Sequence, residues 1–159
     1  MIIAKTILTL SLLFVFFQDT KERMVYWFLF PIIGLLNGFL FYKSTLSELF
    51  FMSIKMNVIF ILIFVVVILL YAKYKLKTPV FNTIGLGDVL LFFALSLSFS
   101  TMAFVVIFIS ALIFSLLLHL LLSKNKKTLT VPLAGYMSLF FLATYFGHWS
   151  GYVDVLYTL

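Results

Sequence analysis

Asp19 and Asp88 are the residues of this sequence best suited to catalytic chemistry. Each is a carboxylic acid at the end of an apolar segment, residues 2–17 for Asp19 and residues 88–98 for Asp88. An ionisable side chain at the centre of a membrane span costs about 2.5 to 3.5 kcal/mol, so one beside such a segment is a functional candidate. Two carboxylates in one site share a proton, and the pair then supplies both a general acid and a general base.

Each aspartate also has a structural explanation. Asp19 can pair with Lys21 or Arg23, and an acid at a helix N-terminus, as expected for Asp88, is stabilised by the helix dipole. Gly85 and Gly87 favour the catalytic interpretation, because glycines adopt positive φ and let an extended peptide approach the backbone. Spacing alone leaves both interpretations open.

The composition predicts a membrane protein. Of 159 residues, 65% are hydrophobic and 10% are charged, whereas a soluble domain has about 25% charged residues. A spanning helix needs about 20 mostly apolar residues, so the chain has room for about six helices and no soluble domain. We therefore expect an all-α fold, a polytopic bundle of about six transmembrane helices in which residues 1–159 form a single domain. The expected helices cover residues 2–17, 24–42, 46–72, 88–98, 102–122 and 131–146.

The basic residues predict how the bundle is oriented. Eight of them fall on one side of the predicted bundle: Lys21, Arg23, Lys73, Lys75, Lys77, Lys124, Lys126 and Lys127. At most three fall on the other side, and the richer side is expected to be cytoplasmic. This assignment predicts a multi-pass protein of the inner (cytoplasmic) membrane, with both termini outside the cytoplasm and both aspartates at the cytoplasmic face. Because the charges lie in short loops, the net charge of +6 does not indicate nucleic-acid binding.

Smaller patterns predict local contacts. Gly34 and Gly38 are spaced for close approach of a second helix, and Asn37 beside them is a candidate for an interhelical hydrogen bond. Thr45 and Glu48 fit a capping box at the start of the third helix. The absence of cysteine excludes disulfides, thiolate metal sites and a cysteine nucleophile.

Three motifs occur in an order that resembles the type IV prepilin and preflagellin peptidases, which are membrane aspartic proteases marked by Gly-x-Gly-Asp. Residues 19–23 (Asp-Thr-Lys-Glu-Arg) resemble the family's Asp-x-x-x-Arg, and residues 84–88 (Ile-Gly-Leu-Gly-Asp) resemble its second motif. Residues 131–135 (Val-Pro-Leu-Ala-Gly) are similar to the start of the family's last helix. The resemblance covers nearly the whole chain and fits the short, peptidase-only members.

The resemblance implies an activity and a substrate. Asp19 and Asp88 would activate a water molecule to attack a peptide carbonyl, and Gly85, Gly87 and Arg23 would bind the substrate. The implied substrate is a pilin-like precursor of a type IV pilus or protein secretion system, with a basic leader, a Gly before the cut and an apolar helix in the bilayer. No metal or organic cofactor is implied, because the two carboxylates and water suffice.

The chain departs from the family pattern in three places. It has Met24-Val25-Tyr26 where the family usually has Ile-Pro-Asn, and it lacks the family's Lys two residues after Asp88. It also lacks the Cys-x-x-Cys loop of the bifunctional members, which argues against zinc and against N-methylation of the product. One alternative is a peptidase-like subunit without activity that serves assembly of a membrane complex. A small transporter is a weaker alternative, since we find no inverted repeat and no charge at mid-membrane. The sequence does not predict the oligomeric state.

Overall fold

The structure, a computed structural model, describes residues 1–76, 85–122, 131–152 and 156–157, and within these ranges it contains six α-helices and no strand. The all-α prediction is therefore confirmed. The π-helical turn Ala72–Leu76 extends the third helix. The helices are α1 (Ile2–Glu22), α2 (Leu29–Ser44), α3 (Ser47–Tyr71), α5 (Leu86–Leu95), α6 (Thr101–Leu122) and α7 (Leu133–Trp149).

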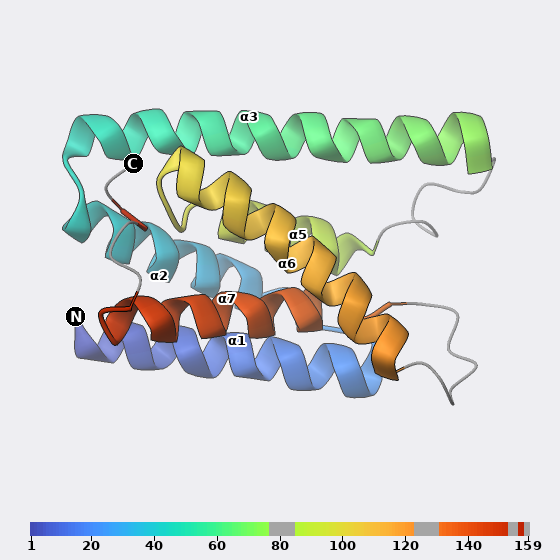
Figure 1. Cartoon of the computed structure of the whole chain (residues 1–159), viewed down its shortest axis with the longest axis horizontal. Coiled ribbons are helices and arrows are strands. Elements are labelled where there is room, and N and C mark those ends of the chain that lie inside the picture. The colour runs from blue at the N-terminus through green and yellow to red at the C-terminus, as the bar shows by residue number, and fades with distance from the viewer. Residues whose placement is uncertain (77–84, 123–130, 153–155, 158–159) are drawn as a thin grey trace.

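Successive helices run in opposite directions along one bundle. In Figure 1, α1, α3 and α6 run one way and α2, α5 and α7 run the other, with α1 and α3 along opposite sides. The main contacts of α7 are with α1 and α6, while α2 packs against α1 and α5. The end of α1 and the starts of α5 and α7 consequently lie at the same end of the bundle.

Three of the helices are long and apolar enough to cross a membrane, namely Ile2–Glu22, Ser47–Lys75 and Thr101–Leu122. Among the shorter helices, α2 has 16 residues and α5 has only 10. At 1.5 Å per residue, α5 is about 15 Å long, roughly half of the 30 Å hydrocarbon core. The chain thus has the features of a helical membrane protein, and the segment predicted as the fourth span is half-length.

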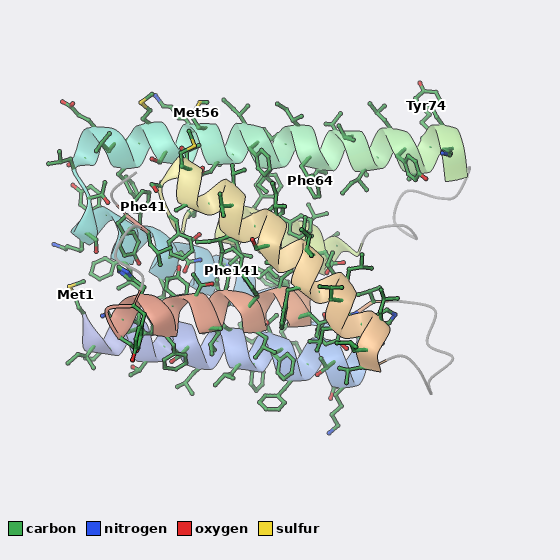
Figure 2. The ribbon with its side chains drawn as sticks, in the orientation of Figure 1. Met1, Phe41, Met56, Phe64, Tyr74 and Phe141 are labelled. Atoms are coloured by element: carbon green, nitrogen blue, oxygen red, sulfur yellow. The ribbon has the colours of Figure 1, made fainter. Side chains whose placement is uncertain are left out.

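The outer surface of the bundle is apolar. Figure 2 shows side chains projecting outward along the whole of α3 and the turn after it, among them Met56 and Tyr74, which are 49% and 73% exposed. The interior is built from aromatic rings such as Phe92 and Phe108, whose centroids are 5.1 Å apart in an edge-to-face arrangement. Apolar surface on this scale is unusual for a soluble monomer and suits a lipid environment.

Two buried asparagines hold the inner end of α5. The side-chain amide of Asn37 donates to the carbonyl of Ala94 at 3.1 Å, and that of Asn57 donates to the carbonyls of Ser96 and Phe99, both at 3.0 Å. The Tyr145 hydroxyl also donates to Asn37 Oδ1 at 2.7 Å. A helix that ends inside an apolar bundle has carbonyls without intrahelical partners, and burying such groups unpaired is costly. The predicted interhelical hydrogen bond of Asn37 is therefore confirmed, and its partner is the short helix.

We expect Asn57→Leu to destabilise the protein, because it leaves the carbonyls of Ser96 and Phe99 buried without partners. The expected loss is about 1–3 kcal/mol, seen as a lower midpoint of thermal unfolding in detergent. Lys55→Leu is the matched control, since Lys55 is an exposed residue of the same helix and should leave the midpoint nearly unchanged. Equal midpoints for the two variants would contradict this account of Asn57.

The ends of the helices differ from the sequence predictions. α1 continues to Glu22 rather than stopping near residue 17, and α2 begins at Leu29 rather than near residue 24. The prediction of a capping box at Thr45 and Glu48 was wrong. The N-cap residue of α3 is Leu46, which makes no side-chain cap hydrogen bond, and the Thr45 hydroxyl donates instead to the carbonyl of Tyr157 at 3.0 Å. A distant backbone acceptor thus replaces the local partner that the pattern predicted.

Candidate active site

Asp19 and Asp88 meet at the N-terminus of α7. The backbone N–H of Gly135 donates to Asp19 Oδ2 at 2.6 Å, and that of Ala134 donates to Asp88 Oδ1 at 2.9 Å. The first amides of a helix lack intrahelical partners and lie at its positive end, so they bind carboxylates well. Two successive amides of one helix therefore hold carboxyl groups from two other helices, as expected if both acids lie at one end of the bundle.

Asp19 belongs to the buried face of α1. Leu8, Leu12, Val15 and Asp19 are the large buried residues of this helix, and their spacing of three or four places them on one stripe. The stripe packs against α7, so the carboxyl at its end is only 8% exposed. Of the two alternative partners of Asp19, Lys21 fits less well, because Lys21 is exposed while Asp19 faces α7. Arg23 does act on the Asp19 carboxyl electrostatically.

Gly135 permits the close approach of α1 and α7. A Cβ atom at this position would lie 3.2 Å from both Cβ and Oδ2 of Asp19 and 3.3 Å from the carbonyl oxygen of Phe16. These distances are shorter than ordinary van der Waals contact, and two of the three atoms are backbone or next to it. Only glycine fits here without displacing the Asp19 carboxyl or separating the helices.

Asp88 lies in the first turn of α5, with Gly85 as the N-cap residue. The Asp88 N–H donates to the carbonyl of Gly85 at 3.1 Å, and the backbone of Gly85 also hydrogen-bonds to the Asp88 carboxyl. The negative charge of Asp19 is close enough to act on Asp88 electrostatically. The half-buried Asp88 carboxyl is therefore surrounded by the N-terminus of α5, by the backbone of Gly85 and by the charge of Asp19.

The predicted role of the two glycines in backbone conformation was wrong. Gly85 has φ −67° and Gly87 lies inside α5; among the described glycines only Gly151 has positive φ. Small size matters at Gly85 instead. A Cβ atom at Gly85 would lie 3.1 Å from Asp88 Oδ2, and one at Gly87 would lie 3.6 Å from the Phe30 ring. The first glycine makes room for the carboxyl, whereas the second faces α2 at ordinary van der Waals distance.

Arg23 follows the last turn of α1 in the left-handed conformation, with φ 58°. Its N–H donates to the carbonyl of Asp19 at 3.3 Å, and its positive charge acts on the Asp19 carboxyl. Non-glycine residues adopt this conformation uncommonly. The turn brings the predicted substrate-binding cation to the same end of the bundle as the two aspartates, where its side chain is exposed.

Sequence reasoning missed the residues that hold the aspartates. The motif at residues 131–135 includes Ala134 and Gly135 but does not predict that their backbone amides bind the two carboxyl groups. The sequence likewise gives no indication that Phe30 lies against Gly87. A usable signal was present: Pro132 precedes a helix that starts at the same end of the bundle as both acids, and a helix N-terminus there attracts carboxylates. Among the described residues, no three His, Cys, Asp or Glu side chains form a group that could hold a metal ion.

The chain matches no protein-family model, no curated protein and no solved structure. Two carboxyl groups, one buried and one half-buried, are bound by successive backbone amides of one helix and are close enough to act on each other electrostatically. Such a pair can transfer protons to and from a water molecule and a reacting carbonyl group.

Proposed function

We propose that this chain is a membrane-embedded aspartic endopeptidase that removes the basic leader of pilin-like precursor proteins, cutting after a Gly at the cytoplasmic face. The observation that supports the proposal most directly is the attachment of Asp19 and Asp88 to successive amides of α7. The motif resemblance depends only on the presence of both acids in the sequence and not on their contact in the fold. Their convergence from α1 and α5 onto one helix end is the additional arrangement that acid–base chemistry needs.

The reaction uses one carboxylate and one carboxylic acid. The carboxylate takes a proton from water as the water oxygen attacks the scissile carbonyl, and the carboxylic acid donates its proton to the carbonyl oxygen. When the tetrahedral intermediate collapses and the C–N bond breaks, the carboxyl group that took the water proton donates it to the leaving nitrogen. The other carboxylate takes back a proton from a hydroxyl of the intermediate, which restores the pair as one carboxylate and one carboxylic acid. The Ala134 and Gly135 amides contribute orientation, because backbone groups of a packed helix hold each carboxyl more firmly than a mobile side chain would.

The proposed membrane arrangement places this chemistry at the cytoplasmic surface. All six helices then enter the inner (cytoplasmic) membrane, the basic loops face the cytoplasm, and both termini face outward. Gly85 is exposed next to Asp88, and Arg23 is exposed near Asp19; we expect both to contact the substrate chain. The motif resemblance implies the pilin-like substrate, and this proposed depth fits a cut between a soluble leader and a membrane-embedded helix.

The test is cleavage by the purified protein. Protein reconstituted in liposomes is incubated with a precursor that carries a basic leader, a Gly and an apolar helix, and the products are identified by mass spectrometry. We expect one cut, directly after the Gly. A precursor that stays intact, with the protein folded and inserted, would refute the peptidase proposal and favour a subunit that serves assembly without catalysis.

A glycine pair offers a sharper test of the Asp88 environment. Gly85→Ala brings a methyl group to 3.1 Å from Asp88 Oδ2, whereas Gly87→Ala meets the Phe30 ring at an ordinary 3.6 Å. We expect Gly85→Ala to lower kcat about 10-fold, because a displaced catalytic group loses alignment, and Gly87→Ala to lower it much less. The reverse order of effects in the liposome assay would contradict the assigned roles.

A further inference from the structure

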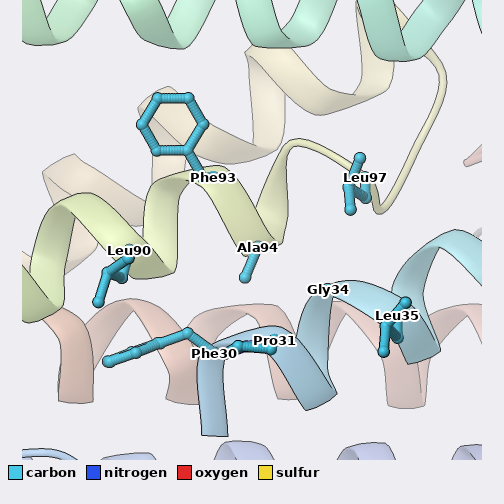
Figure 3. Close-up of a pocket in the computed structure, with 8 residues that line it drawn as sticks. All are labelled: Phe30, Pro31, Gly34, Leu35, Leu90, Phe93, Ala94 and Leu97. Atoms are coloured by element: carbon cyan, nitrogen blue, oxygen red, sulfur yellow. The ribbon is translucent and has the colours of Figure 1, made fainter. Parts of the chain in front are cut away.

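An apolar groove lies between α2 and α5 on the outside of the bundle. Its volume is about 420 Å³, and Figure 3 shows α2 side chains on one wall and α5 side chains on the other. Gly34 and Ala94 form the floor, where a Cβ atom at Gly34 would lie 3.5 Å from the Ala94 Cα. Leu35 stands at the rim and is 74% exposed. The groove therefore opens on the outside of the bundle, where the proposed membrane arrangement places lipid.

One end of the groove lies near the aspartate site. Phe30 lines it, and the ring of Phe30 also packs on Gly87, the residue before Asp88. On the opposite wall, Leu90 and Ala94 follow Asp88 along α5 by about 3 Å and 9 Å, taking 1.5 Å per residue. The groove thus leads from the depth of the carboxyl groups toward the interior of the bilayer.

We propose that this groove binds the apolar helix of the precursor while the residues before that helix cross the aspartates. The assignment rests on the proposed peptidase function, because a cut at the junction of leader and helix requires the helix to lie in the membrane directly beside the site. Helices associate in lipid through close packing, which small residues such as Gly34 and Ala94 permit. A groove of this size accepts one face of a helix, with side chains three and four residues apart entering it.

The location of the groove limits which precursors are cleaved. Because Leu90 lies only about 3 Å beyond Asp88 along the helix, the apolar segment must begin within a few residues of the scissile bond. A lipid acyl chain or a second copy of this protein are the competing occupants, and neither needs the contact between Phe30 and Gly87 that joins the groove to the site.

Crosslinking identifies the occupant. The chain has no cysteine, so Leu35→Cys introduces a single thiol at the rim, and Leu10→Cys introduces one at an exposed leucine of α1, 65% exposed, as the matched control. Each variant is labelled with a thiol-directed benzophenone, reconstituted with the precursor and irradiated. We expect an adduct from position 35, mapped by mass spectrometry to the first turns of the precursor's apolar helix, and none from position 10.

Filling the groove gives a kinetic test. Leu35→Trp should raise KM for the full precursor at least about 10-fold with kcat nearly unchanged, as expected when binding common to ground and transition states is lost. Cleavage of a short peptide that contains the cut site but no apolar helix should not change, and Leu10→Trp should change neither. Two results would overturn the groove assignment alone: adducts from position 35 to lipid or to a second copy in place of the precursor, or cleavage by the wild type with no adduct specific to position 35. If the wild type leaves the precursor intact, both the peptidase proposal and the groove assignment are refuted.

Discussion

Asp19→Asn and Asp88→Asn should each abolish precursor cleavage while the protein remains inserted in the membrane. Asparagine has nearly the shape of aspartate, and its Oδ1 can still accept from the Gly135 or Ala134 amide, so the helix contacts should persist. What is lost is the carboxyl proton and the negative charge. Since general acid–base catalysis contributes about 10²- to 10⁴-fold, we expect a loss of that order in kcat. The assay measures cleavage of the liposome-embedded precursor.

Glu22→Gln is the matched control for both variants. Glu22 lies three residues after Asp19 at the end of the same helix and is exposed, so removing its charge changes the local field without touching the site. Its cleavage rate should stay within about 2-fold of the wild type, because exposed charges are largely screened by solvent and salt. Full cleavage by either aspartate variant would end the peptidase proposal, and a Glu22 effect as large as theirs would show that charge near this membrane face, rather than the pair, controls the rate.

Gly135→Val should reduce both stability and cleavage. The added Cβ would lie 3.2 Å from Asp19 Cβ and 3.3 Å from the Phe16 carbonyl oxygen, and neither atom can rotate away as a flexible side chain would. α1 and α7 must then separate, which lengthens the 2.6 Å hydrogen bond to Asp19. Overpacking of this kind typically costs about 1–3 kcal/mol, and displacement of a reacting group by about 1 Å costs about 10²-fold in rate. Thermal unfolding in detergent and precursor cleavage measure the two effects.

Gly38→Val separates this effect from the general response to a bulkier residue. Gly38 is also a helical glycine, but a Cβ there meets only Leu97 Cβ, at 3.9 Å, which is ordinary contact. We expect a small change in unfolding midpoint and near-normal cleavage. If Gly135→Val cleaves as well as Gly38→Val, the close fit of Asp19 against α7 is not needed for activity.

Much of the site was predictable from the sequence, because it depends on which end of a helix each residue occupies. Apolar segment lengths and loop charges placed Asp19 and Asp88 at one end of the bundle, and that placement is confirmed by their contacts with α7. Asn37 was predictable as well, since a lone amide beside Gly34 and Gly38 in an apolar helix has to find a partner on another helix. These predictions succeed because helical periodicity and hydropathy can be read from a single segment of the chain.

The predictions that failed depend on contacts between segments that are far apart in sequence. Thr45 has a suitable partner three residues away, yet its hydroxyl bonds to the carbonyl of Tyr157. Gly87 is a second case: the pattern predicts a flexible backbone there, but the residue lies inside α5 and faces the Phe30 ring of α2. The sequence predicts a short helix from residue 88, but it does not predict that Asn37 and Asn57 donate to the carbonyls at and just beyond the end of α5, because those side chains come from other helices.

For the two aspartates, some features follow from patterns within one helix and others from contacts between helices. Composition and patterns within single helices predict the helical class, the apolar surface and the location of both acids at one end of the bundle. That the carboxyls share the N-terminus of α7 depends on the tertiary structure, because this contact needs Gly135 to bring α1 against α7 and needs α5 to start at the same level. Hydrogen bonds between helices act over about 3 Å, and no pattern along a single segment specifies a distance that short.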